Sequence, residues 1–111
     1  MLSINIPVYN VKVVRLVSQL SKQAERLNIT FEIRVYDDGS KAAIKKANRK
    51  IRSMPHVIYS ELPKNLGRAA IRNKMGFEST FAHLLFIDAD SKIISKNYLS
   101  AYLRYADISD V

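Results

Sequence analysis

The chain has 111 residues, of which 48% are hydrophobic and 25% are charged, and its formal net charge is +8. The length predicts a single domain covering residues 1–111, and the composition is typical of a globular protein rather than a disordered one. The absence of cysteine excludes a disulfide framework, a zinc–thiolate site and a thiol nucleophile. The excess of positive charge favours an anionic partner, for which nucleic acid, phospholipid headgroups and a phosphorylated small molecule all qualify.

The N-terminal segment MLSINIPVYN lacks the basic start and the apolar core of a signal peptide. No apolar run reaches the ~18 residues that a membrane helix needs. A cytoplasmic location is therefore expected, which includes the inner face of the membrane. Much of the positive charge lies in residues 41–52, where it forms either a solvated helix face or a basic binding surface.

The first half of the chain predicts a strand, a helix and a second strand. Residues 2–8 are short and apolar, and Pro7 near their end stops them from extending as a central strand. Five apolar residues then recur at helical spacing and form one face of an amphipathic helix: Val13, Val17, Leu20, Ala24 and Leu27. Residues 31–35 alternate between apolar and charged side chains, as in a strand, and lead into two adjacent aspartates and a glycine.

The second half predicts three helices and two strands. A helix over residues 41–53, with Ser40 as its cap, ends before Pro55. A short strand over residues 56–59 and a loop lead to an alanine-rich helix over residues 66–78. Residues 84–87 are the most apolar stretch, and a last helix follows a Ser95 cap.

Strands that alternate with helices in this way predict an α/β fold with a Rossmann-like, mostly parallel sheet, helices on both faces and strand order 3-2-1-4. Ligands of such sheets bind beyond the carboxyl ends of the strands. Polar residues collect there in this sequence. Pro7, Tyr9 and Asn10 follow the first strand, Asp37 and Asp38 the second, and Asp88 and Asp90 the fourth.

Two acidic segments carry candidate chemistry. In the segment Asp37-Asp38-Gly39-Ser40, a carboxylate at a strand end can accept hydrogen bonds from a base or a ribose hydroxyl; the alternative is a helix cap. In Asp88-Ala89-Asp90, two carboxylates one residue apart repel each other, and a divalent cation relieves this repulsion. Oxygen ligands suit Mg²⁺ or Mn²⁺. The alternative is a solvated turn.

A third segment, NLGRAAIRN, begins the third predicted helix. Gly67 permits either a close backbone approach or an unusual dihedral angle. Arg68 and Arg72 lie four residues apart near a helix N-terminus, where the dipole favours anions, although an ordinary helix start with two solvated arginines fits equally. Neither phosphate-binding glycine motif, G-x-x-x-x-G-K-[ST] or G-x-G-x-x-G, occurs in the chain. His56 and His83 are interpreted as structural.

Four motifs together, IPVYN, YDDGS, NLGRAAIRN and LLFIDAD, resemble glycosyltransferase family 2 in order and spacing, and the resemblance covers essentially the whole chain. It implies the nucleotide-sugar-binding half of a GT-A fold, with the acceptor half missing, and an enzyme that inverts configuration at the anomeric carbon. The C-terminal run ADISDV resembles the approach to the family's next strand. A general base is expected beyond residue 111, so the fragment alone is expected to bind donor and metal without transferring sugar.

The resemblance also implies roles for individual residues. Pro7, Tyr9 and Asn10 would surround the donor's base, which Asp38 would bind with Asp37 beside it. Gly67 and Arg72 would border the nucleotide. Asp88, with Ala89 beside it, would reach the ribose or the metal, and Asp90 would ligate the metal that bridges the diphosphate.

The expected partners are a nucleotide-sugar donor, with a UDP-sugar favoured, and a glycan or other hydroxyl acceptor, as in polysaccharide biosynthesis. Peripheral membrane association is compatible with the sequence. The missing half is expected to leave apolar surface uncovered at Ile87 and at the last helix (Tyr98, Leu99, Tyr102 and Leu103), which would favour a homodimer. The alternatives are a non-catalytic nucleotide-sugar-binding module and a basic nucleic-acid-binding α/β domain. Acids at the strand ends would repel nucleic acid, so nucleic acid is not expected.

Overall fold

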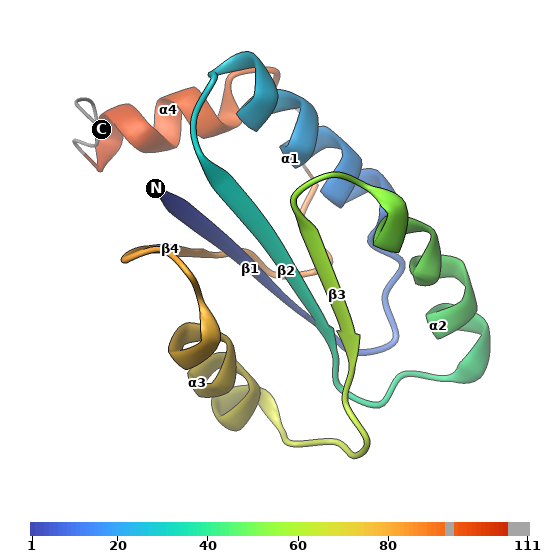
Figure 1. Cartoon of the computed structure of the whole chain (residues 1–111). Coiled ribbons are helices and arrows are strands. Elements are labelled where there is room, and N and C mark those ends of the chain that lie inside the picture. Colours follow the sequence, from blue (N-terminus) through green and yellow to red (C-terminus); the bar gives the residue numbers. More distant parts are fainter. Residues whose placement is uncertain (93–94, 107–111) are drawn as a thin grey trace.

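The computed structural model describes residues 1–92 and 95–106 and contains a four-stranded parallel sheet of order β3-β2-β1-β4 (Figure 1). This is the strand order that the sequence predicts. The elements are β1 (Leu2–Val8), α1 (Val14–Arg26), β2 (Phe31–Asp37), α2 (Ala42–Asn48), the 3₁₀ helix η1 (Arg49–Ser53), β3 (Val57–Glu61), α3 (Arg68–Glu78), β4 (His83–Phe86) and α4 (Tyr98–Tyr105). The expected run into a further strand lies outside the described residues, apart from Ala106. None of the described helices is long and apolar enough to cross a membrane.

One face of the sheet forms the main core. Alternate residues of β1 (Leu2, Ile4 and Ile6) are fully buried there against α1, η1 and α4. The predicted apolar face of α1 is confirmed, because Val17, Leu20 and Ala24 are fully buried while the cations of the helix are exposed. Each such apolar side chain contributes roughly 1.5–3 kcal/mol by leaving water, and alanine less.

The other face of the sheet is polar and packs against α3 and the turn that follows it. Glu32 of β2 accepts hydrogen bonds from Ser3 Oγ (2.6 Å), Thr80 N (2.7 Å) and Thr80 Oγ1 (3.0 Å), and Arg34 Nε lies 3.1 Å from its carboxylate. Burial alone would raise the pKa of Glu32, but these hydrogen bonds lower it below its ordinary value. Glu32 therefore fastens the α3–β4 turn to the sheet. A smaller apolar cluster on this face joins Tyr36, Leu62, Ile71 and Met75, so helices cover both faces, as predicted.

Pro7 does not end β1, which continues to Val8 and pairs with strands on both sides. The carbonyl of Val8 accepts a hydrogen bond from the N–H of Asp38, the residue after β2, and the carbonyl of Asn5 accepts one from the N–H of Ile87, after β4. The backbone polar groups of successive β1 residues therefore point alternately toward β2 and β4. Residue 7 points toward β4, whose pairing stops opposite Asn5. The missing N–H of Pro7 therefore removes no bond from the sheet.

Several predicted boundaries are wrong by one or two residues, and the helix caps explain why. Lys41, not Ser40, precedes α2, because Ser40 Oγ instead accepts a hydrogen bond from Asn10 N (2.7 Å). Asn97, not Ser95, precedes α4. The predicted helix over residues 41–53 divides into α2 and η1.

The expected uncovered apolar surface is also not found where it was predicted. Ile87, Leu99 and Leu103 are buried in the main core, because α4 folds back against α1. Within the described residues, the large apolar side chains that are almost fully exposed are instead Phe77 and Tyr105.

Candidate functional site

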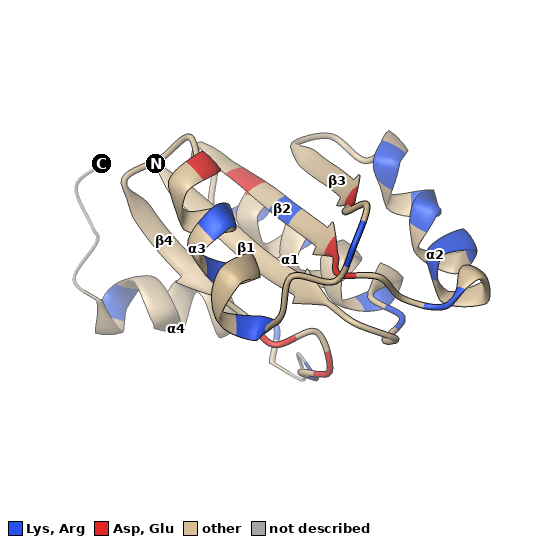
Figure 2. Cartoon of the chain, turned by 90° about the horizontal axis from the view of Figure 1, so that it is seen from below, with Lys and Arg blue, Asp and Glu red and all other residues tan. Residues whose placement is uncertain are grey.

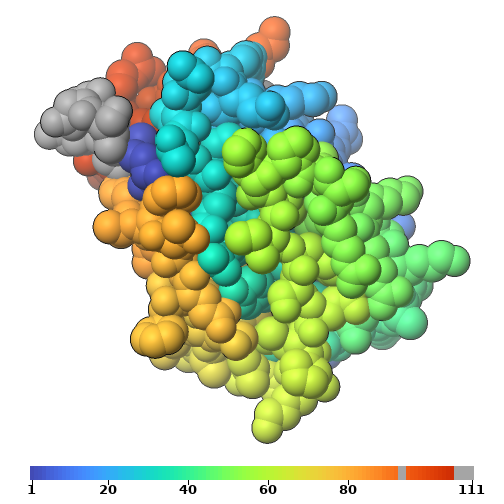
Figure 3. Space-filling model, in the orientation of Figure 1, coloured from blue at the N-terminus to red at the C-terminus, as the bar shows by residue number. Residues whose placement is uncertain are grey.

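A cleft of about 380 Å³ lies at the carboxyl edge of the sheet, where β1 lies between β2 and β4. From β1 the chain adds β2 and β3 on one side, and later passes through α3 to add β4 on the other side. The edge between β1 and its neighbours is therefore the topological switch point, where the strand order reverses. In Figure 3, β4 and the end of α3 (orange) lie on one side of β2 (cyan), and α2 and β3 (green) lie on the other. The cleft is lined by Pro7, Val8, Tyr9, Val11, Asp38, Asn65, Gly67, Arg68, Ile71, Asp88, Ala89 and Asp90.

Asp38 lines the cleft and also holds the loop that begins α3. Its Oδ1 accepts a hydrogen bond from Leu66 N (2.7 Å) and its Oδ2 accepts one from Gly67 N (3.1 Å), while its carbonyl accepts one from Asn65 Nδ2 (2.7 Å). A carboxylate has about four acceptor positions, so two remain for a ligand. Asp38 can therefore hold the loop and accept a hydrogen bond from a ligand at the same time.

Asp37 does not line the cleft, although it adjoins Asp38. Its side chain is fully buried, and its Oδ1 accepts hydrogen bonds from Gly39 N (3.0 Å) and Ser40 N (2.7 Å). This pattern is that of an Asx turn, which shapes the segment after β2. The buried Oδ2 has no partner within the described part of the chain.

Asn10 and Arg72 also lie outside the cleft lining. Asn10 adopts a left-handed backbone (φ 57°), and its Oδ1 accepts a hydrogen bond from Lys41 N (2.8 Å), so it ties the loop after β1 to the start of α2. The Arg72 guanidinium lies over the Phe86 ring, 4.5 Å from its centre. Such a cation–π contact uses the side chain for packing.

Gly67 precedes α3 and lines the cleft with φ 88°. A Cβ at this position would meet no atom within 4 Å. Of the two reasons that the sequence offers for this glycine, the structure therefore supports the unusual dihedral angle rather than a close approach of the backbone.

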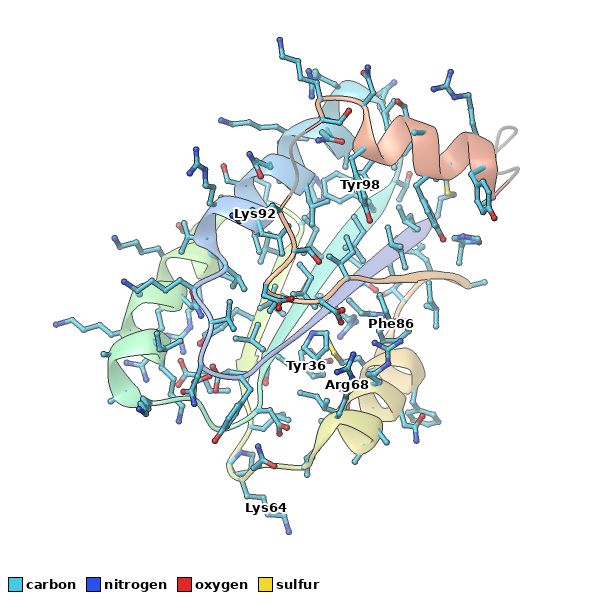
Figure 4. The ribbon with its side chains drawn as sticks, turned by 180° about the vertical axis from the view of Figure 1, so that it is seen from behind. Tyr36, Lys64, Arg68, Phe86, Lys92 and Tyr98 are labelled. Carbon is cyan, nitrogen blue, oxygen red and sulfur yellow. The ribbon has the colours of Figure 1, made fainter. Side chains whose placement is uncertain are left out.

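Asp88, Asp90 and Arg68 form the charged rim of the cleft. Arg68 Nη2 lies 3.5 Å from Asp88 Oδ1, with 79% of the arginine side chain and 59% of the aspartate side chain exposed. Figure 4 shows Arg68 reaching from α3 toward the chain that follows β4, close to Phe86, whereas Lys64 points away from the molecule. Although Arg68 and Arg72 are one turn apart, only Arg68 reaches the cleft.

The two aspartates are the candidate metal ligands. Both are exposed and line the cleft, and among the described residues no third acidic or histidine side chain joins them in a metal-binding cluster. Two carboxylates suit a cation that takes its remaining oxygen ligands from water and from a bound phosphate. The residues therefore fit Mg²⁺ or Mn²⁺ in the presence of a phosphorylated ligand.

Five lining residues were not among the predicted site residues: Val8, Val11, Asn65, Arg68 and Ile71. Asn65 and Arg68 lie within the NLGRAAIRN segment, so that motif carried a signal for them. The apolar residues of the lining resemble ordinary core positions in the sequence. The apolar floor and charged rim together suit a flat ring with an anionic group attached.

A separate ion pair lies beyond the cleft at the end of β3. Glu61 accepts hydrogen bonds from Arg49 Nε (2.8 Å), Arg49 Nη2 (2.9 Å) and Tyr59 Oη (3.0 Å), and Arg52 lies 4.0 Å away. Hydrogen bonding by Arg49, together with Tyr59 and the positive charges, lowers the pKa of Glu61 to about 2. Arg49 and Arg52 of η1 are thus paired with a carboxylate, whereas Lys45 and Lys46 of α2 form no ion pair within the described part of the chain.

Comparison with known proteins agrees with this architecture. The family model described as "Glycosyl transferase family 2" matches residues 3–109. No curated protein matches the chain. Among solved structures, the chain is similar to residues 1–349 of S. aureus TarS in complex with UDP-GlcNAc, with 27% identity and a TM-score of 0.74, over 96% of this chain and 31% of that chain. The same TarS region in complex with UDP gives 27% identity and a TM-score of 0.74, over 96% of this chain and 32% of that chain.

A more distant similarity, to the mannosyltransferase PcManGT from Pyrobaculum calidifontis in complex with GDP-Man and Mn²⁺, has 17% identity and a TM-score of 0.67, over 94% of this chain and 31% of that chain. The chain thus spans about a third of the length of these relatives. The fold matches the nucleotide-binding half of a GT-A enzyme. The match over nearly all of its length shows that the chain belongs to glycosyl transferase family 2.

Proposed function

We propose that this chain binds a nucleotide-sugar donor, with a UDP-sugar favoured, as part of an enzyme that transfers the sugar to a hydroxyl acceptor. The observation that carries the proposal is the cleft, around which Asp38, Arg68, Asp88 and Asp90 meet from the ends of β2 and β4 and the start of α3. The preference for UDP is supported by the TarS structures, which hold UDP-GlcNAc and UDP.

The base of the donor would lie between Tyr9, Val11 and Asp38. Tyr9 is 57% exposed and forms part of the cleft lining, so its ring is available to pack against a flat ligand. The free acceptor positions of Asp38 suit the ring N–H of uracil. This arrangement supplies apolar contact and one directional hydrogen bond.

The diphosphate would lie between Arg68 and the two aspartates. The N-terminus of α3 favours an anion, and Arg68, its first residue, can donate to two phosphate oxygens. Without a donor, the Arg68 guanidinium contacts Asp88. Binding of the diphosphate with a cation would give Arg68 an anionic partner and leave the Asp88 carboxylate for the cation.

Asp88 and Asp90 would hold Mg²⁺ or Mn²⁺ beside the diphosphate. The cation would neutralise the negative charge that develops on the leaving nucleoside diphosphate, as Lewis acids do in phosphate chemistry. We further propose a glycan or other hydroxyl acceptor, inversion at the anomeric carbon, and a general base outside this chain. The 111 residues would then bind donor without multiple turnovers.

Isothermal titration with UDP, UDP-GlcNAc and GDP, with and without Mn²⁺, tests the proposal. UDP and UDP-GlcNAc should bind more tightly with Mn²⁺ than without it, and Asp90→Ala should remove the Mn²⁺ dependence. Glu25→Ala, which removes an exposed carboxylate on α1, is the matched control and should bind like the original chain. If no nucleotide bound under either condition, the proposal would be wrong.

A further inference from the structure

A second groove lies between α1 and α2, away from the aspartates of the cleft. It has a volume of about 630 Å³. Four cations line it, Lys12, Arg15, Lys22 and Lys50, and the rest of its lining is Val14, Ser18, Gln19 and Ala47. No carboxylate is among the lining residues, so the groove is uniformly positive.

The charge of this groove is not neutralised by neighbouring side chains. Arg49 and Arg52, which flank Lys50, both contact Glu61. In contrast, none of the four groove cations forms an ion pair within residues 1–92 and 95–106. Figure 2 shows Lys and Arg repeated along α2, whereas several acidic positions lie at the ends of β2 and β3 and in the loop after β4. Among the described residues, the groove therefore carries unpaired cations, whereas Asp88 and Asp90 lie at the rim of the cleft.

The cations of the groove are also suitably spaced. Arg15 and Lys22 are seven residues apart on α1, which places them two turns apart on one helix face, about 10 Å along the axis. Lys50 faces them from η1. Such a groove can surround an extended or branched anion and focuses the positive potential on it.

The chemistry of the lining suits phosphate groups better than nucleic-acid bases or the apolar interior of a bilayer. No aromatic side chain is present in the lining, so a nucleic-acid base would find no stacking surface there. The exposed large apolar residues in the part of the chain that the structure describes are Tyr9, Ile58, Phe77 and Tyr105. All four lie outside the lining, so no side chain there is suited to insertion into a bilayer. The recognition that remains is charge and hydrogen bonding from lysine and arginine, which suits phosphate groups.

We propose that the groove between α1 and α2 is a second anion site that binds phosphate groups, presented either by a soluble phosphate compound or by lipid headgroups. This site is separate from the donor cleft and does not depend on the function proposed for the cleft. The two sites are neighbours, because Val11 lines the cleft and Lys12 lines the groove. Asn48 fixes this segment by donating to the Val11 carbonyl (2.9 Å) and accepting from Val13 N (2.9 Å).

The first experiment locates the site. The ¹⁵N-labelled chain is titrated with inorganic tripolyphosphate, and backbone amide shifts are followed by NMR. Shifts at residues 12–22 and 47–50 are expected. Shifts confined to Asp38, Gly67 and residues 88–90 would assign the anion to the cleft and overturn the proposal.

The second experiment compares two triple variants with the same change in net charge. Lys12→Gln/Arg15→Gln/Lys50→Gln removes groove cations, whereas Lys64→Gln/Lys96→Gln/Arg104→Gln removes exposed cations from three other segments. A cation that faces an anionic surface strengthens binding by roughly a factor of five. The groove variant should therefore bind tripolyphosphate or anionic vesicles about a hundredfold more weakly than the original chain. The control variant should retain most of the affinity. An equal loss in both variants would show that only net charge matters and would overturn the proposal.

A third measurement distinguishes the two sources of phosphate. Co-sedimentation with vesicles of phosphatidylglycerol in phosphatidylcholine is compared with pure phosphatidylcholine vesicles, using both variants. Binding to the anionic vesicles only, with no tripolyphosphate shifts in either the groove or the cleft, assigns the site to lipid headgroups. Tripolyphosphate shifts in the groove without vesicle binding assign it to soluble phosphates. Binding to neither, or tighter binding of a single-stranded oligonucleotide than of tripolyphosphate, would contradict the proposal.

Discussion

Asp38 and Gly67 are joined by a hydrogen bond of 3.1 Å from the Gly67 N–H to the Asp38 carboxylate, across 29 positions of the sequence. The side chain proposed to bind the base therefore also sets the start of the helix proposed to face the diphosphate. The Asp38 carboxylate therefore contributes both to stability and to the proposed ligand binding, and substitutions can measure the two contributions separately.

Replacement of Asp38 by Ala should lower the free energy of unfolding by about 2–4 kcal/mol, because the N–H groups of Leu66 and Gly67 both lose their acceptor. Asp38→Asn keeps one oxygen acceptor and should lose about half as much. Urea denaturation measures both values. An unchanged midpoint for the Ala variant would show that water replaces the carboxylate without cost.

Replacement of Gly67 by Ala should destabilise the chain by about 1–2 kcal/mol, because an L-residue is strained at φ 88° even though its Cβ has space. Gly76→Ala is the matched control within α3. Its Cβ would lie 3.6 Å from Leu84 Cδ1, an ordinary contact, and alanine favours helix by up to about 1 kcal/mol. Thermal unfolding should therefore shift in opposite directions for the two variants, and a shift in the same direction would contradict the dihedral argument.

Replacement of Arg68 by Gln should weaken UDP about tenfold or more, since a hydrogen bond to a charged group contributes about 1.5–3 kcal/mol. Uridine, which carries no phosphate, should bind the variant and the original chain equally. Arg72→Gln removes the same charge from the next turn, where the guanidinium packs on Phe86, and should affect both ligands little. Equal losses for UDP and uridine in the Arg68 variant would assign this residue to the base rather than to the diphosphate.

The stability contribution of Glu61 should depend on pH in a defined direction. Its pKa is lowered to about 2 in the folded chain from an ordinary value of 4.5, mainly by Arg49. A lowered pKa means that the stabilisation is complete above the ordinary value and is lost as the pH falls toward 2. The stability difference between the original chain and Glu61→Gln should therefore shrink between about pH 5 and pH 2. A difference that stayed constant over this range would contradict the proposed ion pair with Arg49.

The sheet order was predictable because apolar strands alternated with helical spacing and the acids followed the strands. Asp88 and Asp90 could be assigned to the cleft because the end of a parallel strand fixes where the next residues lie. Asp37 could not be distinguished from Asp38 in the same way. Two neighbouring aspartates cannot be distinguished in a sequence. Only the structure shows that the Asp37 carboxylate accepts the hydrogen bonds of a turn while Asp38 lines the cleft.

Helix caps and long-range contacts account for the remaining differences. Ser40 has the side chain of a helix cap, but its hydroxyl pairs with Asn10, 30 positions away. Arg68 and Arg72 share one helix face by spacing, but the Arg72 guanidinium packs on the Phe86 ring, so only Arg68 lines the cleft. The burial of Leu99 also depends on a distant partner, because Gln23 of α1 accepts a hydrogen bond from its N–H (2.9 Å). Helical periodicity predicts none of these three partners.

The polar face that Glu32 organises also protects the chain from misassembly of its sheet. In the native alignment Leu2 lies beside Phe31 and Ser3 beside Glu32, so apolar and polar residues each share a face. Sliding β2 by one position would turn Glu32 and Arg34 into the apolar core and expose Phe31 and Ile33 on the opposite side. Such a slipped state would bury charges without their partners Ser3 and Thr80, at a cost of several kcal/mol. Glu32 thus selects against the alternative pairing, while the apolar residues select for the native one.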